Sequence, residues 1–189
     1  MIKLRMYLLL LFLCSLITGC FAPKAEIDVF RIDILQGDIH SLKLGYEYNE
    51  SWNIIQTSDE QVLLTIDESD IENYDWQNQV ITLTETGSMK LEPYLPDILI
   101  TKNAFIVRLG DQKQYGGVVI EEGSAMAIRY PVIYISTESA TNYKLTIRPL
   151  HEISHQSDGL QGFDLADRQI IEIAGIYDRL KQAAKLTEN

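Results

Sequence analysis

Residues 104–120, Ala-Phe-Ile-Val-Arg-Leu-Gly-Asp-Gln-Lys-Gln-Tyr-Gly-Gly-Val-Val-Ile, carry the pattern that decides the fold. Two runs rich in apolar residues, 104–109 and 115–120, flank the dipeptide Gly110-Asp111. β-Branched and aromatic residues favour strands, and a Gly-Asp pair between two such runs favours a turn. The stretch therefore predicts an antiparallel β-hairpin.

Strand patterns continue on both sides of this hairpin. Apolar and β-branched residues predict further strands at 27–35, 42–48, 52–56, 61–66, 80–83, 128–136 and 143–148. Turns are expected at Gln36-Gly37-Asp38 and at Gln77-Asn78. Pro131 lies inside one run, and because proline cannot donate a ladder hydrogen bond it predicts an edge position or a bulge there.

An internal helix is expected directly after the strand at 80–83. Thr84 is a typical N-cap residue, and Glu85 follows in the first turn, where the helix dipole favours an acid. The helix should run to about Tyr94 and end near Pro93 or Pro96, because proline disrupts the helical hydrogen bonds.

The C-terminal segment has helical rather than strand periodicity. Asp164 and Asp167 stand at capping-box spacing, with Asp in place of the usual Glu at the second position. Apolar residues then recur at helical intervals, at Ile170, Ile173, Ala174, Tyr177, Leu180 and Ala184. We expect an amphipathic helix over 165–186, packed on the sheet. The whole pattern predicts an α+β fold, mainly an antiparallel β-sheet with one short internal helix and a C-terminal amphipathic helix.

One segment has a local resemblance to a known fold. Gln79-Val-Ile-Thr-Leu-Thr-Glu-Thr-Gly-Ser-Met-Lys-Leu91, followed by Ala104-Phe-Ile-Val-Arg-Leu-Gly-Asp111, resembles the strand–helix–strand unit in the periplasmic head of SecD-type translocase subunits. The resemblance covers about residues 79–120. It implies a helix packed on a sheet and carries over no function.

The first twenty residues have the layout of a secretory leader. Lys3 and Arg5 precede the apolar run 8–13, which is too short to span a bilayer, since a spanning helix needs about 20 residues. Small and polar residues come next and end in Ile17-Thr18-Gly19-Cys20. An ordinary cleaved signal peptide and an uncleaved membrane anchor are two interpretations of such a leader.

A third interpretation is a lipoprotein leader, because the segment resembles the bacterial lipoprotein signal, whose lipobox is an aliphatic residue, two small residues and a cysteine. The resemblance implies cleavage after Gly19, lipidation of the Cys20 sulfur, and acylation of the new amino terminus with a fatty acid such as palmitate. Several acyl chains hold a protein on a membrane where one does so only marginally. The non-Asp residue Phe21 implies export to the outer membrane if the host is Gram-negative. The expected organisation is a signal peptide at 1–19, a lipidated tether at 20–25 and a single domain at 26–189.

Charge and cysteine content limit the range of partners. The 189 residues carry a net charge of −11, and removal of residues 1–19 would leave 14 basic and 27 acidic residues, or −13. This acidity excludes the electrostatics that nucleic acids and anionic lipid surfaces require, so lipid rather than charge would hold the protein to its membrane. With Cys14 in the leader and Cys20 lipidated, the domain would contain no free thiol and no disulfide.

The segment His151-Glu152-Ile153-Ser154-His155 matches the H-E-x-x-H zinc-peptidase pattern. On a helix, both imidazoles would share one face and could bind zinc while Glu152 acts as general base. The context opposes this assignment. Pro149 and the stretch 157–159 leave little room for a helix, and no third ligand is clearly placed, Glu172 being near the required spacing but not at it.

Two functional hypotheses therefore remain. The favoured one is a non-enzymatic, lipid-anchored cell-envelope lipoprotein that binds or assembles with another envelope protein, without cofactor or catalytic residue. The alternative is a lipid-anchored zinc hydrolase that uses His151, Glu152 and His155. A further acidic run, at Asp67-Glu68-Ser69-Asp70 with Glu72 and Asp75, lacks the ligand pattern of a calcium loop and is interpreted as a solvated acidic face.

Overall fold

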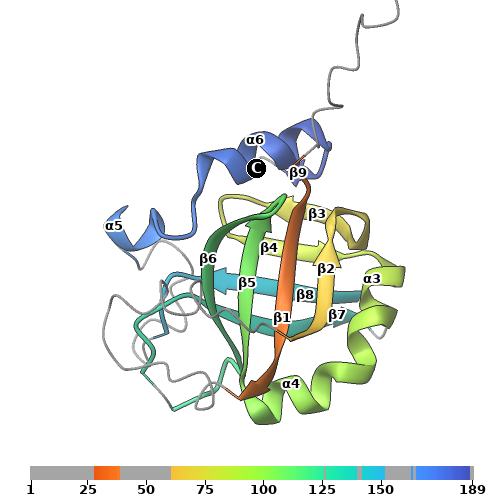
Figure 1. The fold of residues 1–189 in the computed structure, drawn as a ribbon, viewed down its shortest axis with the longest axis vertical. Coiled ribbons are helices and arrows are strands. Elements are labelled where there is room, and N and C mark those ends of the chain that lie inside the picture. The colour runs from red at the N-terminus through yellow and green to blue at the C-terminus, as the bar shows by residue number, and fades with distance from the viewer. Residues whose placement is uncertain are drawn as a thin grey trace, which may run out of the picture.

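The computed structural model describes residues 28–38, 61–125, 127–139, 142–151, 163 and 165–187. In these described residues, nine strands form one curled, mainly antiparallel sheet, with short helices packed around its ends (Figure 1). The predicted α+β fold class is confirmed. The predicted strands at 42–48 and 52–56, the leader, the tether, Glu152 and His155 lie outside the described residues.

The first half of the sheet contains the predicted central hairpin. It comprises β2 (Val62–Asp67), β1 (Phe30–Asp38), β5 (Asn103–Leu109) and β6 (Gln112–Ile120), in that spatial order and all antiparallel. The turn between β5 and β6 contains Gly110 with a φ of 59°, a conformation that glycine adopts without strain.

The second half runs across the first (Figure 1). It comprises β7 (Val132–Ser139), β8 (Asn142–Arg148), β4 (Val80–Leu83), β3 (Ile71–Asp75) and the two-residue β9 (Leu186–Thr187). The two halves join where β6 and β7 pair in parallel, and β9 pairs in parallel with β3. The other neighbours in this half are antiparallel.

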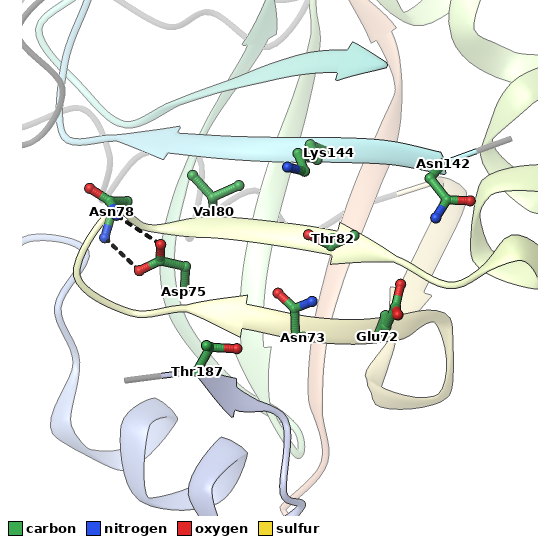
Figure 2. A pocket seen from close by; sticks show the side chains of 9 residues that line it. All are labelled: Glu72, Asn73, Asp75, Asn78, Val80, Thr82, Asn142, Lys144 and Thr187. Carbon is green, nitrogen blue, oxygen red and sulfur yellow. Dashed lines mark hydrogen bonds between the residues drawn. The ribbon is translucent and has the colours of Figure 1, made fainter. Parts of the chain in front are cut away.

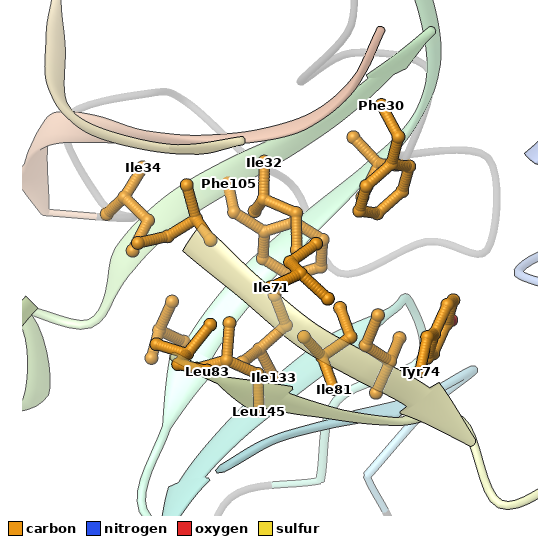
Figure 3. Close-up of a cluster of buried hydrophobic side chains, with 14 of the residues drawn as sticks. Phe30, Ile32, Ile34, Ile71, Tyr74, Ile81, Leu83, Phe105, Ile133 and Leu145 are labelled. Carbon is orange, nitrogen blue, oxygen red and sulfur yellow. The ribbon is translucent and has the colours of Figure 1, made fainter. Parts of the chain in front are cut away.

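The core lies between the two halves. Alternate residues of each strand point inward, as the two-residue period of a strand requires. The first half contributes aromatic and aliphatic side chains such as Phe30, Ile32 and Phe105 (Figure 3). The second half meets them with side chains that include Tyr74, Ile81, Leu83, Ile133 and Leu145 (Figure 3). Each fully buried aliphatic side chain of this kind contributes about 2 kcal/mol of hydrophobic free energy.

The internal helix begins where the sequence predicts and extends further. Thr84 is the N-cap of α3 (Glu85–Leu91), and its hydroxyl accepts a hydrogen bond from the Gly87 amide at 3.0 Å. The chain then continues through the 3-10 turn η2 (Glu92–Tyr94) into α4 (Leu95–Thr101). The prolines do not stop it because each lies in the first turn of its element, where no amide donor is required.

The predicted continuous C-terminal helix is wrong in its length. The structure has two short helices, α5 (Leu165–Arg168) and α6 (Ala174–Gln182), separated by turns at 169–173. In the gap, Ile171 is completely buried in the core, and the β-branched residues there have lower helix propensity. After α6, Ala184 adopts a left-handed conformation and the chain turns into β9.

Two local predictions are also corrected. The turn expected at Gln36-Gly37-Asp38 is part of β1, which continues through an irregularity to pair Asp38 with Asn103. The strand expected to start at Ile128 begins at Val132, and it lies in the interior of the sheet between β6 and β8. Pro131 precedes the strand, so no ladder donor is lost, and its carbonyl accepts a hydrogen bond from the Val118 amide.

Candidate functional site

A groove of about 590 Å³ lies on the outer face of β3, β4, β8 and β9, opposite the core (Figure 2). Its lining is almost entirely polar and consists of Glu72, Asn73, Asp75, Asn78, Val80, Thr82, Asn142, Lys144 and Thr187. This hollow, in the described part of the chain, is our candidate functional site.

Strand alternation places these side chains on one face. In β4, Ile81 and Leu83 are buried in the core, so Val80 and Thr82 point the other way, into the groove. The register aligns Thr82 with Lys144 of β8 on one side and with Asn73 of β3 on the other. The three strands therefore present a transverse row of an ammonium, a hydroxyl and an amide.

A second row crosses the groove at its other end. Asp75 of β3 lies opposite Val80 of β4 and opposite Thr187 of β9. Glu72 is the extra residue of an irregularity in β3, between the pairs that Ile71 and Asn73 make with β4. A bulge turns an additional side chain toward one face, which accounts for Glu72 beside Asn73 in the lining (Figure 2).

The turn between β3 and β4 fixes this second end of the groove. The Asn78 side-chain amide donates to one Asp75 carboxylate oxygen at 2.7 Å, and the Asn78 backbone amide donates to the other at 3.1 Å (Figure 2). Gln79 follows with a φ of 51°, and its buried side chain donates to the Trp76 carbonyl at 2.8 Å. The Tyr74 hydroxyl also donates to Gln79. The side chains at this rim are therefore held in place before any ligand arrives.

The chemistry of the lining suits a polar ligand. Amides and hydroxyls both donate and accept hydrogen bonds, the carboxylates of Glu72 and Asp75 accept, and the Lys144 ammonium donates. Such a surface recognises a ligand by directional hydrogen bonds rather than by apolar burial. Sequence reasoning missed these residues because the strands that carry them pair over long sequence separations. The only sequence signal is the outward polar residue at alternate positions, as at Thr82 and Lys144.

His151, the first residue of the H-E-x-x-H match, has a clear structural environment. It forms an isolated antiparallel bridge with Ile128 and is only 1% exposed. The Tyr134 hydroxyl lies 2.6 Å from its Nδ1, and its Nε2 lies 2.9 Å from the Ser124 carbonyl oxygen. Because a carbonyl only accepts, Nε2 carries a proton, and in the neutral imidazole Nδ1 then accepts from Tyr134. Zinc would have to displace one of these two partners.

The rest of the proposed zinc pattern is not brought together by the described residues. Glu152 and His155 lie outside them, and the backbone at His151 is paired as a strand rather than as a helix. Glu172, the weak candidate for a third ligand, forms an ion pair with Arg168, in which Nη2 of Arg168 lies 2.6 Å from Oε1 of Glu172. In the described ranges, no three His, Cys, Asp or Glu side chains are grouped so that they could hold a metal ion.

Comparison with known protein families, curated proteins and solved structures finds no match to this chain. Its function is therefore inferred from the residues themselves. Of the helices in the described part of the chain, none is both long enough and apolar enough to cross a bilayer.

The acidic run at 67–75 is largely structural rather than a solvated face. Asp67 caps the 3-10 turn η1 (Glu68–Asp70) by accepting from the Ser69 amide at 2.8 Å. Asp70 is 4% exposed and accepts from the Lys90 ammonium at 2.7 Å. Glu68 receives two hydrogen bonds of 2.5 Å from Arg179. Glu72 and Asp75 alone reach the candidate groove.

Proposed function

We propose that this chain is a lipid-anchored lipoprotein of the cell envelope whose domain has a non-enzymatic binding or assembly role. The observation that carries the proposal is the order and spacing of three features in the leader. The basic residues Lys3 and Arg5 come first, the apolar run 8–13 follows, and the lipobox at 17–20 comes last. In this proposal the mature chain begins at the lipidated Cys20, and the outer membrane is its location if the host is Gram-negative.

The groove supports the binding part of the proposal. Its rim is ordered by hydrogen bonds that do not need a ligand, and its lining carries amides, hydroxyls and charged groups. Preorganised polar groups lower the entropy cost of binding a polar partner. An envelope protein that presents such groups would act by recognition.

The anchor is tested by Cys20→Ser in the full-length chain. We expect the variant to lose fatty-acid labelling, because the thiol is the acceptor of the lipid. It should also remain uncleaved and should no longer be held in the membrane fraction by lipid. Metabolic labelling with palmitate and intact-protein mass spectrometry measure both steps. The matched control is Cys14→Ser, which removes the other cysteine and should leave labelling and cleavage unchanged, since residue 14 belongs to the leader. Normal labelling of Cys20→Ser would show that the lipobox interpretation is wrong.

The binding role is tested at the groove with single cysteines, because the proposed mature domain has no other free thiol. Asn73→Cys and Thr187→Cys place a thiol on the groove, and Gly123→Cys places one on an exposed turn outside it. Maleimide should label the two groove thiols several-fold more slowly in intact envelopes than in purified protein. Labelling of the Gly123→Cys control should be equal in both. If each of the three thiols were labelled at the same rate in intact envelopes as in purified protein, a groove-bound partner would be contradicted.

A further inference from the structure

The helical stretch from Glu85 to Thr101 exposes an unusual amount of apolar surface. In the described part of the chain, five large apolar side chains are exposed, and three of them lie on this stretch. Met89 is 61% exposed, Tyr94 is 37% exposed and Ile100 is 78% exposed. A single exposed apolar side chain needs no explanation, whereas several on consecutive short elements, here α3, η2 and α4, mark a candidate contact surface.

The exposed positions lie on the outward sides of α3 and α4 and of the turn between them. The backbone is right-handed helical through both junctions, at Leu91 and at Leu95. Within α3 and within α4 the exposed residues recur at intervals of three or four, which places them on the outward side of each helix, and the chain bends between the two helices at η2 (Figure 1). We call these outward sides together the outer ridge, which consists of Glu85, Thr86, Met89, Glu92, Pro93, Tyr94, Pro96, Asp97 and Ile100. The opposite side is buried through residues such as Leu91 and Ile98.

The outer ridge combines apolar side chains with negative charge. Glu85, Glu92 and Asp97 are all exposed and alternate with Met89 and Ile100. No Lys or Arg belongs to the ridge, and the ammonium of Lys90 is directed to the buried Asp70 carboxylate at 2.7 Å. A complementary partner must therefore offer an apolar face flanked by Lys or Arg.

The position of the ridge argues against a bilayer as the occupant. The chain enters β1 at Phe30, beside β9 and α6, and β1 ends near the C-terminus of α4 at the opposite side of the molecule (Figure 1). A nine-residue strand spans about 30 Å. In the proposed lipoprotein, whose lipidated end precedes β1, the membrane lies toward the end away from α4, and this placement rests on the proposed anchor at Cys20. A symmetric ridge-to-ridge contact with a second copy is also disfavoured, since both surfaces would present the same acids.

We propose that the outer ridge is a docking surface for a basic, apolar-faced segment of another polypeptide. The apolar side chains supply the buried contact, and the acids select a cationic partner and accelerate its association. The ridge shares no residue with the groove, so this proposal stands independently of what the groove binds.

The test uses the full-length protein, purified in detergent, and an amphipathic helical peptide of about 18 residues that contains only Leu and Lys. We expect saturable binding at the ridge, and Ile100→Ala should weaken it by about tenfold. The substitution leaves the fold intact, because the side chain is exposed and alanine favours the helix. A Leu/Glu peptide of the same length should not bind.

The contribution of charge is isolated by two matched pairs of substitutions. Glu92→Gln with Asp97→Asn should weaken the Leu/Lys peptide severalfold and reduce the salt dependence of binding. Glu121→Gln with Asp178→Asn removes the same charge from other exposed positions and should have little effect. Equal weakening by both pairs, or no effect of Ile100→Ala, would overturn the proposal. The proposal would also be overturned if Ile100→Ala left peptide binding unchanged but abolished self-association of the protein or its binding to phosphatidylglycerol vesicles.

Discussion

At the scale of single residues, the Tyr134–His151 pair fixes the segment at the end of β8. Tyr134→Phe should cost about 1–3 kcal/mol at neutral pH, because it leaves the buried His151 Nδ1 without its donor. Burial also raises the pKa of Tyr134 from 10.0 to about 12. The folded state therefore favours the neutral phenol, so its contribution to stability is complete below pH 10 and is lost as the pH rises toward about 12.

Urea unfolding followed by circular dichroism, at neutral pH and between pH 10 and 12, measures both effects. The alkaline loss of stability should be smaller in Tyr134→Phe than in the wild type. Part of it should persist, because burial also raises the pKa of Tyr115. Tyr94→Phe is the control for the loss at neutral pH and should leave stability there unchanged, since the Tyr94 side chain is exposed. An unchanged pH profile in Tyr134→Phe would contradict the role given to this phenol.

The acidic run shows what sequence reasoning can and cannot predict for individual residues. Its carboxylates look solvated in sequence, yet Asp70 and Glu68 bind cations that lie 20 and 111 residues further along the chain. A local sequence pattern cannot predict partners that lie so far away in the chain. Burial raises the pKa of Asp67, but hydrogen bonds from Ser69 and the nearby Lys90 charge outweigh this effect and leave that pKa below 3.8. The contribution of its cap to stability is therefore complete above the ordinary pKa of 3.8 and is lost as the pH falls below it.

At the scale of elements, the ion pair between Arg179 and Glu68 holds α6 on the sheet. The two side chains are only 18% and 12% exposed, and Glu68 also accepts from the Phe30 amide at 2.7 Å. Arg179→Met removes both hydrogen bonds and leaves a largely buried carboxylate without its cation. We expect a loss of about 3 kcal/mol in unfolding free energy and faster amide exchange throughout α6.

The Arg168–Glu172 pair provides the comparison. It is more exposed, at 33% and 18%, and it lies within one local segment. Arg168→Met should therefore cost only about 0.5 kcal/mol and should leave the exchange of α6 unchanged. Equal losses from the two substitutions, in denaturant unfolding and hydrogen-exchange mass spectrometry, would show that the Arg179 pair does not anchor the helix.

Elements with local signals could be predicted and elements that depend on packing could not. Thr84 identifies the start of α3 because the N-cap interaction is made within one turn. The C-terminal apolar residues recur at helical spacing and so predict one continuous helix. The break occurs where Ile171 enters the core, and β9 forms by pairing with a strand more than a hundred residues earlier. Both features depend on tertiary contacts.

At the scale of the whole molecule, the sequence predicts most of the described strands but not their order. The hairpin of β5 and β6 is readable because its strands are adjacent in sequence. The neighbours β4 and β8 are separated by the 58 residues 84–141, and their pairing creates the groove. Hydrophobic alternation assigns a side chain to one face of a strand but cannot say which strands lie side by side.

The join between the two halves of the sheet depends on the absence of a side chain at Gly117. A Cβ at this position would lie 1.9 Å from the Pro131 carbonyl oxygen and 2.7 Å from the Phe105 ring. The Pro131 carbonyl cannot simply move away, because it accepts the hydrogen bond from the Val118 amide that starts the parallel pairing of β6 with β7. Gly117→Ala must therefore separate these strands or displace the core.

We expect Gly117→Ala to reduce the unfolding free energy by about 3 kcal/mol, at the upper end of the usual cost of overpacking. Denaturant unfolding measures this loss, and amide exchange should accelerate most in β6 and β7 because the strain is applied at their junction. Gly123→Ala is the matched control, since a Cβ there meets no atom within 4 Å. It should stay within about 0.5 kcal/mol of the wild type. A tolerated Gly117→Ala would mean that the two halves are not held in contact at this point, and the crossed arrangement that forms the core would need another join.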